Sequence, residues 1–388
     1  MNVYTLRGFF LGWLSILLIH CSNPDWKATG KTEQSKRWSE HRVNDWYSNQ
    51  PWWVGTNFCP STSVNQLEMW QNETFDLTSI DEELKLSAGI GMNTHRIFLH
   101  NLLWEQDSLG FLDRLNAFLD VADRYDIKCM IVLFDGVWDP NPKLGGQQIP
   151  VPYTHNSRWV QSPGAKYLAD KEKRPILKSY VQGVISHFAD DDRILLWDLF
   201  NEPENPNKKS YAEVELEDKY VRAFDLLKAS FKWAREVNPS QPITSGVWGN
   251  FLKKDDHDTV KIDSLHAFML DNSDVITFHS YDRPSVLLEK IKYLQIYNRP
   301  ILCTEYLARS RDNTFENLLP VFKKFKIGAY NWGLVSGKTN TIYPWNSWDS
   351  VYLNEPKVWH HDIFRDDGTP YKQSEVDFIT ELLVVNKQ

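Results

Sequence analysis

Short apolar segments alternate with amphipathic stretches along most of the chain. Apolar runs bounded by turn residues predict buried strands, and apolar positions at helical spacing between them predict helices. This alternation predicts βα units that build a parallel sheet. The predicted strands are Trp52–Phe58, Thr94–Leu99, Cys129–Phe134, Ile194–Phe200, Pro242–Val247, Val275–His279, Pro300–Glu305 and Ala329–Leu334. Eight strands with their crossovers favour a single-domain α/β fold, the closed (β/α)8 TIM barrel, over an open sheet.

Local signals predict where some of the helices begin and end. The segment 79–82, Ser-Ile-Asp-Glu, has the form of a capping box that opens the first helix, and Gly89 closes it. Apolar residues recur at helical spacing in Phe111–Tyr125 and in Tyr220–Val237, and Asn238 with the following proline ends the second of these.

Two connections, 135–175 and 335–370, are too long for simple turns. Barrel enzymes place their active sites on the face formed by the loops after the strands. Both connections are rich in aromatic residues, namely Trp138, Tyr153, Trp159, Tyr343, Trp345, Trp348, Tyr352 and Trp359. Because the apolar faces of sugar rings stack on aromatic rings, we interpret the two connections as walls of a sugar-binding cleft. The alternative is that they are insertions with no role at the site.

The N-terminus has the form of an export signal. Arg7 precedes an apolar run, 8–19, that is too short to span a bilayer, which takes about 20 apolar residues. Cys21 follows Leu-Ile-His and resembles a bacterial lipoprotein cleavage site, although a small residue is usual where His20 stands. We expect a signal peptide over 1–21, a flexible tether over 22–40 and the barrel over 41–388. The protein is then exported to the periplasm, the outer membrane or the cell surface, with lipidation of Cys21, simple cleavage and a retained anchor as alternatives.

Composition narrows the remaining function classes. The net charge of −8 provides no basic surface for nucleic acid, and 17 tryptophans suit a carbohydrate site, although most of them could instead fill the core. Cys59, Cys129 and Cys303 lie in apolar surroundings, and we expect them to be buried free thiols. No Cys or His spacing indicates a metal site. We therefore expect no metal or cofactor, no nucleic-acid partner, and a monomer.

Two glutamates end predicted strands. Glu202 follows the fourth apolar run, and Glu305 ends the seventh. Cleavage of a glycosidic bond needs two carboxyl groups, one to protonate the leaving oxygen and one to stabilise or attack the anomeric carbon. Strand ends of a barrel hold such a pair at a fixed separation. A single Glu after a strand is usually a surface residue, but the pairing on strands four and seven predicts a catalytic pair.

At these positions the sequence resembles glycoside hydrolase clan A, especially the cellulase and mannanase type of family 5, over about residues 50–335. Asn201-Glu202-Pro203 is similar to the acid/base motif, in which the Asn contacts the substrate 2-hydroxyl, and Glu305 is similar to the nucleophile of the seventh strand. The resemblance implies a retaining, β-specific glycosidase.

Further positions extend the resemblance. Tyr281 in His279-Ser280-Tyr281 is similar to the Tyr that holds the nucleophile, and Arg96 to the second-strand Arg that supports it. Trp332 is similar to the eighth-strand Trp beneath the cleaved sugar. Arg96 and Tyr281 would keep Glu305 ionised, whereas burial and the charge of Glu305 would raise the pKa of Glu202. Structural alternatives are a core histidine for His279, an ion pair within the barrel for Arg96 and core packing for Trp332.

One position departs from the family pattern. After the third strand, where many members carry His or Asn, this chain has Asp135-Gly136-Val137-Trp138, and we expect Asp135 to hydrogen-bond a sugar hydroxyl. This departure puts a standard cellulase or mannanase specificity in doubt. Further cleft candidates follow the first and second strands, namely Asn57, His100, Asn101 and Trp104.

The sequence therefore predicts a retaining β-glycoside hydrolase that cleaves a mannan-, xylan- or glucan-like polysaccharide or oligosaccharide by double displacement. One alternative is an exo-acting β-glycosidase that trims side chains or chain ends. Another is a catalytically dead, surface-tethered barrel that binds glycans. A metal-dependent barrel hydrolase is a third, but it needs a ligand set that the histidines do not provide.

Overall fold

The computed structural model describes residues 37–254 and 260–384. Within them, eight parallel strands form one sheet in the order β5-β4-β3-β2-β1-β10-β9-β8. A further pairing of Val247 with Phe278 joins β5 to β8 and closes the sheet. The strands are β1 Val54–Phe58, β2 Thr94–Phe98, β3 Lys128–Asp135, β4 Ile194–Asn201, β5 Ile243–Thr244, β8 Ile276–His279, β9 Ile301–Tyr306 and β10 Gly328–Trp332. The predicted (β/α)8 barrel is confirmed, and each strand overlaps its predicted run.

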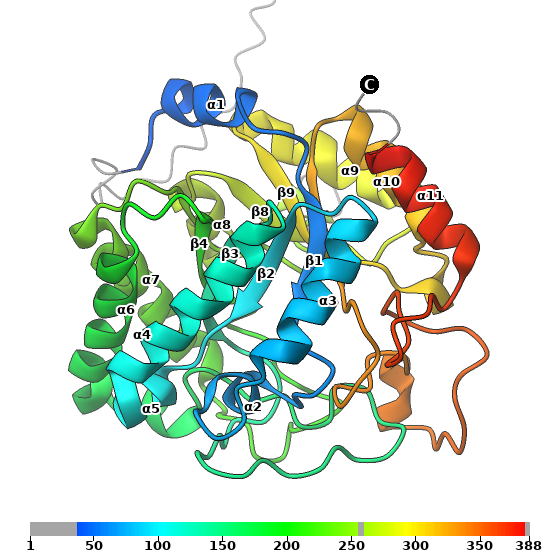
Figure 1. The fold of residues 1–388 in the computed structure, drawn as a ribbon. Helices are drawn as coiled ribbons and strands as arrows, with labels where there is room; N and C mark the ends of the chain where they lie inside the picture. Colours follow the sequence, from blue (N-terminus) through cyan, green and yellow to red (C-terminus); the bar gives the residue numbers. More distant parts are fainter. Residues whose placement is uncertain (1–36, 255–259, 385–388) are drawn as a thin grey trace, which may run out of the picture. The chain divides into compact units, whose positions relative to one another are not determined.

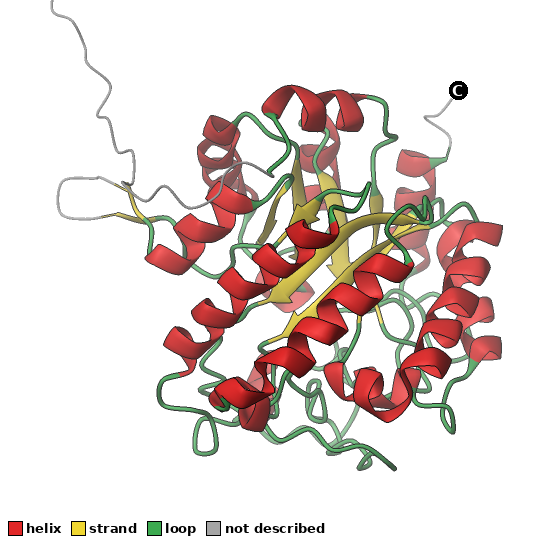
Figure 2. Cartoon of the chain, turned by 90° about the vertical axis from the view of Figure 1, so that its left-hand side faces the viewer, coloured by secondary structure: helices red, strands yellow, loops and turns green. Residues whose placement is uncertain are grey.

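Helices surround the sheet (Figures 1 and 2). They are α1 Glu40–Ser48, α2 Gln66–Trp70, α3 Leu77–Gly89, α4 Asn101–Arg124, α5 Ala165–Ala169, α6 Arg174–His187, α7 Lys219–Val237, α8 Ser264–Asn272, α9 Pro284–Leu294, α10 Phe315–Lys324 and α11 Gln373–Leu383. Lys253–Lys254 and Val260–Lys261 form a separate antiparallel pair, β6 and β7. No helix among the described residues is long and apolar enough to cross a membrane.

The start of α3 corrects one sequence prediction. The helix begins at Leu77, and its N-cap is Asp76, whose carboxylate accepts a hydrogen bond from the Ser79 backbone N–H. Ser79 therefore lies inside the first turn and does not cap the helix. Asp is as good an N-cap as Ser, so Asp76 can cap the helix three residues before Ser79. The predicted end at Gly89 and the end of α7 at a left-handed Asn238 agree with the structure.

The N-terminal helix α1 lies across the end of the barrel at which the strands begin (Figure 1). Trp38, Val43 and Tyr47 pack there against side chains from the strands, including Leu302 and Tyr330. The predicted signal peptide lies outside the described residues, as does the predicted tether up to residue 36. Trp38 is buried, so the packed part of the chain begins before residue 41, where we predicted the barrel to begin.

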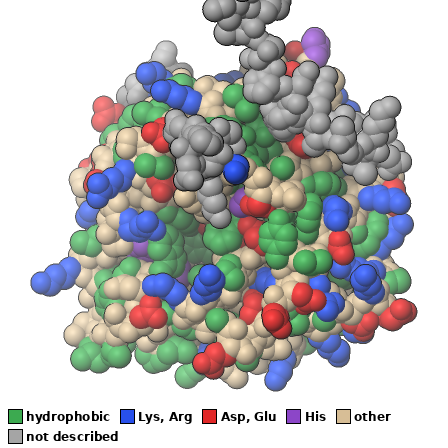
Figure 3. Space-filling model, turned by 180° about the vertical axis from the view of Figure 1, so that it is seen from behind, with side chains coloured by type: hydrophobic (Ala, Val, Ile, Leu, Met, Phe, Trp, Pro, Cys, Tyr) green, Lys and Arg blue, Asp and Glu red, His purple; other side chains and the backbone are tan. Residues whose placement is uncertain are grey.

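The opposite end of the barrel carries the long connections. Those after β3 and β10 contact each other through hydrogen bonds from Asn156 N to Thr339 O (2.7 Å) and from His155 N to Ser347 Oγ (2.9 Å). On the face in Figure 3, basic and acidic side chains are interspersed. Cys129 and Cys303 are buried free thiols as expected, whereas Cys59 is only half-buried.

Candidate active site

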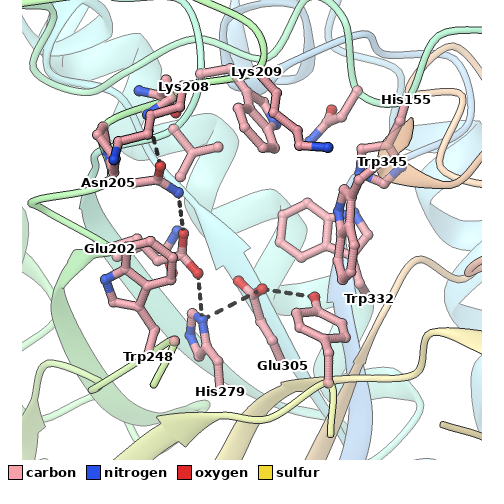
Figure 4. A pocket seen from close by; sticks show the side chains of 18 of the residues that line it. His155, Glu202, Asn205, Lys208, Lys209, Trp248, His279, Glu305, Trp332 and Trp345 are labelled. Carbon is pink, nitrogen blue, oxygen red and sulfur yellow. Dashed lines mark hydrogen bonds and ion pairs between the residues drawn. The ribbon is translucent and has the colours of Figure 1, made fainter. Parts of the chain in front are cut away.

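Glu202 and Glu305 face each other inside the barrel mouth (Figure 4). Glu305 lies within β9, and Glu202 comes directly after β4. One carboxylate oxygen of each and one ring nitrogen of His279 all lie within 4.8 Å of one another. Three such ligand atoms could also hold a metal ion. The hydrogen bonds and charges around each carboxyl group therefore bear on which chemistry the site performs.

The backbone of Glu202 turns sharply, with φ of 41°. Left-handed φ is uncommon for residues other than glycine, and it occurs where the surrounding structure fixes it. Here Gly136 N donates to Asn201 O at 2.8 Å, and a Cβ on Gly136 would lie 2.1 Å from Glu202 O. Gly136 therefore permits the close approach of the β3 and β4 ends that aims Glu202 into the mouth.

Glu305 receives two donors. Tyr281 OH donates to Oε2 at 2.8 Å, and Arg96 Nη1 lies 3.3 Å from Oε1. Burial raises the pKa of Glu305 to about 7 and the charge of Glu202 adds to the rise, while His279, the charge of Arg96 and the Tyr281 hydrogen bond act in the opposite direction. The two donors thus favour the ionised form of this carboxyl group.

Arg96 is fully buried and has a fixed position. Its guanidinium donates to Asp198 Oδ2 at 2.8 and 3.0 Å, to Asn201 Oδ1 at 2.8 Å and to Asn57 Oδ1 at 2.8 Å. Asp198 supplies the counter-charge that a buried guanidinium needs. The structure thus brings Arg96 to both Glu305 and Asn201, whereas Asn57, predicted as a cleft residue, contacts Arg96 and does not line the cavity.

Within the part of the chain that the structure describes, no Lys or Arg side chain makes a hydrogen bond with Glu202. Asn205 Nδ2 donates to its Oε2 at 2.6 Å, and Oε1 lies 2.8 Å from His279 Nδ1. Burial raises the pKa of Glu202 to about 7, and the main charge adding to this effect is Glu204 rather than the expected Glu305. Burial also lowers the pKa of His279 to about 4, so the imidazole between the two carboxyl groups is neutral.

Asp135 does not take the role that we predicted for it. Its carboxylate is buried and accepts four hydrogen bonds from the protein. The donors are Trp159 Nε1 (2.6 Å), Asn201 Nδ2 (2.9 Å), Val137 N (3.1 Å) and Gln66 Nε2 (3.2 Å). With these contacts Asp135 holds Asn201, and it leaves no lone pair directed at a sugar.

The candidates after β2 also lie outside the cavity. His100 is the N-cap of α4, where Nδ1 accepts from Leu102 N and Nε2 lies 2.9 Å from Gln161 O. Asn101 is buried next to Ser162, and Trp104 packs against Tyr180 on the outer side of the strands. None of these three residues lines the cavity, because α4 begins three residues after the end of β2 and carries them away from the mouth.

The carboxyl pair lies in a cavity of about 640 Å³, within the range of small-ligand sites. Trp138 and Trp332 line it as predicted, and so do Trp345 and Trp348 from the second long connection. Trp332 and Trp345 lie on the Glu305 side, whereas Trp248 lies beside Glu202 (Figure 4).

Sequence reasoning missed Asp198, Asn205 and Trp248. Asp198 carries a signal, because a charged residue in the middle of an apolar strand needs a buried partner. Asn205 and Trp248 lie in loops, and only the folded chain shows that they contact the glutamate or line the cavity.

Two facing, buried carboxyl groups at the C-terminal ends of the strands of a (β/α)8 barrel fit the requirements of a glycoside hydrolase. Residues 53–337 match the cellulase family, glycosyl hydrolase family 5. The chain belongs to this family, as the resemblance implied.

Solved structures share the fold at low identity. An exo-β-1,4-mannosidase from Opitutaceae bacterium strain TAV5 is 18% identical, with a TM-score of 0.58. The match covers 86% of this chain but only 59% of the mannosidase. An endo-1,4-β-D-mannanase from Thermotoga petrophila RKU-1 is 16% identical with a TM-score of 0.53, over 86% of this chain and 99% of the mannanase. An endo-1,4-β-mannanase from Rhizomucor miehei is 14% identical with a TM-score of 0.53, over 86% and 96%. No curated protein sequence matches the chain.

Proposed function

We propose that the protein hydrolyses β-linked glycosides with retention of configuration, with Glu305 as nucleophile and Glu202 as acid/base. The observation that carries this proposal is the unequal environment of two carboxyl groups whose oxygens lie within 4.8 Å. Of the two glutamates, only Glu305 accepts hydrogen bonds from Arg96 and Tyr281, and among the described residues the hydrogen-bond partners of the Glu202 carboxyl group are Asn205 and His279. These donors favour the ionised form of Glu305, and we therefore assign the proton of the acid/base to Glu202.

The reaction follows from this distribution of charge. An oxygen of Glu305 attacks the anomeric carbon while Glu202 gives its proton to the glycosidic oxygen, and the leaving sugar departs as an alcohol. Glu202, now ionised, removes a proton from water as the water oxygen attacks the same carbon. The bond to Glu305 breaks, and both carboxyl groups return to their starting states.

Replacing Glu305 by Ala tests the assignment. We expect turnover to fall by more than about a thousandfold, because loss of a nucleophile costs several kcal/mol of barrier. Added azide should restore part of the rate and yield the α-configured glycosyl azide. A variant that keeps more than about a tenth of the wild-type rate would refute the role of Glu305.

A contact between loops at one side of the cavity favours exo action. The loops after β3 and β10 join on the side of the cavity that holds Trp332, through the hydrogen bonds of His155 and Asn156. Lys209 of the loop after β4 adds an ion pair of 2.9 Å to Asp349. We infer that these joined loops form a wall that leaves room for only one sugar, the terminal one, on the glycone side. The mannosidase and mannanases among the structural neighbours suggest mannose as that sugar, with xylan- and glucan-like substrates as alternatives.

End-labelled β-linked oligosaccharides distinguish the two modes. Exo action releases monosaccharide alone from the non-reducing end, so the labelled reducing end shortens by one sugar at a time. Early release of internal fragments would establish endo action and would leave the proposed catalytic pair intact. A panel of β-mannosides, β-xylosides and β-glucosides in the same assay identifies the sugar.

We further propose that the protein is exported and held at a membrane by a lipid on Cys21. The support is the apolar run and the cysteine that follows it, which lie outside the described residues. The native protein should partition with membranes, and Cys21→Ala should release it or block its processing. A mature protein whose mass shows an unmodified N-terminus beyond residue 21 would rule out lipidation.

A further inference from the structure

Lys219 is a buried lysine behind the turn that carries Glu202. Only 3% of its surface is exposed, and it is the first residue of α7. Lysine is rarely buried this far, and a positive charge at the N-terminus of a helix is unfavourable because the helix dipole is positive there. Neither burial nor helix stability favours a lysine at this position, so its role depends on what its ammonium group contacts.

The ammonium group of Lys219 joins the connections after β3 and β4. Nζ donates to Gly136 O at 2.7 Å, in the connection after β3, and to Asn205 O at 2.6 Å, in the connection after β4. The remaining proton goes to Glu215 Oε2 at 2.7 Å, so every donor of the ammonium group is used.

The ion-pair partner of Lys219, Glu215, is buried as well. Its carboxylate also accepts from Gln161 Nε2 at 2.6 Å, Asn207 Nδ2 at 2.7 Å and Leu216 N at 3.0 Å. The pair therefore holds both connections at one point. Because Glu215 keeps these other donors when Lys219 is replaced, we expect such a variant to fold.

The contacts of Lys219 reach Glu202 by two short routes. The first passes through Asn205, whose carbonyl Lys219 holds and whose Nδ2 donates to Glu202 Oε2 at 2.6 Å (Figure 4). The second passes through Gly136, whose N–H donates to Asn201 O at 2.8 Å, directly before Glu202. Lys219 thus holds the two residues that fix the Glu202 turn and its carboxyl group.

We propose that Lys219 is a positioning residue for the acid/base, and that it holds the Glu202 carboxyl group within reach of the glycosidic oxygen. This inference rests on the proposed function and deepens it. A positioned general acid contributes about 10²–10⁴-fold to the rate, and a misplacement of about 1 Å can cost about a hundredfold. Loss of Lys219 should therefore slow those substrates whose leaving group needs a proton.

The test compares two substrates with the same terminal sugar. The leaving oxygen of a β-linked disaccharide needs a proton, whereas the leaving group of a dinitrophenyl glycoside departs without one. We expect Lys219→Gln, which is shorter and neutral, to lower kcat/KM for the disaccharide by at least about tenfold and for the aryl glycoside by less than about twofold. Lys219→Met lacks every donor and should show a larger effect. If Lys219→Met does not fold, Lys219→Gln decides the test.

The matched control is Arg235→Gln, at the other end of the same helix. Arg235 forms an ion pair of 2.6 Å with the buried Asp274 and donates to Asn272 O at 3.1 Å. Like Lys219, it joins a carboxylate and a backbone carbonyl, but its contacts lie where β8 begins, away from the barrel mouth. The control should lose stability and keep the wild-type ratio of the two kcat/KM values.

Asn205→Ala tests the route from Lys219 to Glu202. The change removes the donor to Glu202 and keeps the carbonyl that Lys219 contacts. In the Asn205→Ala background, Lys219→Gln should change the ratio of the two kcat/KM values less than it does in the wild type. Fully multiplicative effects of the two changes would refute this route.

The outcomes separate the two proposals. If Lys219→Gln lowers kcat/KM for both substrates by the same factor, or for neither, the positioning role is refuted and the catalytic pair stands. A selective loss of the same size in Arg235→Gln would refute the positioning role too. If the wild-type protein cleaves neither substrate in a panel of terminal sugars, the proposed function itself fails, and the positioning role with it.

Discussion

Replacing Tyr281 by Phe removes one hydroxyl from the site and keeps its ring. The hydroxyl donates to Glu305 Oε2 at 2.8 Å, and the ring packs at 4.8 Å against Trp345. A hydrogen bond to a charged group contributes about 1.5–3 kcal/mol. Because Arg96 remains as a second donor, we expect the fold to persist and the loss to fall on the ionised form of Glu305.

The sign of the pH effect follows from that loss. The nucleophile must be ionised, so its protonation sets the acidic limb of the pH–rate profile. Burial already raises the pKa of Glu305 to about 7, and Tyr281 opposes this rise. Without the hydroxyl the pKa rises further, and the acidic limb moves to higher pH. At a pH below the limb, the rate should fall by about tenfold to a hundredfold, the kinetic equivalent of about 1.5–3 kcal/mol.

The assay measures kcat/KM against pH for the wild type, Tyr281→Phe and the matched control Tyr330→Phe. Tyr330 is also buried, and its hydroxyl lies 3.0 Å from Thr94 Oγ1 at the other end of the barrel. The control should lose about 1 kcal/mol of stability and keep the wild-type limb. An acidic limb that stays in place, or moves to lower pH, in Tyr281→Phe would refute the reasoning about Glu305.

Three further changes probe other parts of the site. Glu202→Gln should slow natural glycosides far more than aryl glycosides with good leaving groups and should remove the alkaline limb of the pH–rate profile; equal losses on both would refute the acid role. Asp135→Asn places an amide against four donors, so denaturant unfolding should show a free energy of unfolding lower by about 1–3 kcal/mol. The value of kcat/KM should also fall, because Asn201 loses its acceptor, and a variant as stable as the wild type would contradict this hydrogen-bond network. Prolonged chelation should leave activity unchanged, and a loss that a divalent metal restores would assign Glu202, His279 and Glu305 to a metal site instead.

The strands could be predicted because burial on both faces of a parallel sheet leaves continuous apolar runs in the sequence. β5 is the weakest case, since only Ile243–Thr244 form ladder pairs, and Val247 makes the remaining contact. The two glutamates were identifiable because barrel topology directs the ends of all strands to one face.

Asp135 and His100 were misassigned because sequence patterns do not determine the direction of an individual side chain. Asp135 ends β3 on the correct face, yet its side chain turns toward Trp159 and Asn201, and no local pattern encodes that direction. Helix α4 begins one residue after His100, so a residue that looked like part of a cleft became an N-cap. The Glu204–His266 pair joins two segments far apart in the sequence and is visible only after folding.

The anomeric configuration of the first product tests the central claim most directly. Retaining enzymes hold their carboxyl groups about 5–5.5 Å apart, whereas inverting enzymes need about 6.5–9.5 Å to place a water between them. With oxygens of Glu202 and Glu305 within 4.8 Å of each other, the site fits direct attack by Glu305. An NMR time course on a β-linked substrate should show the β-anomer of the released sugar first, followed by mutarotation. Appearance of the α-anomer first would contradict the double displacement and the role of Glu305 as nucleophile.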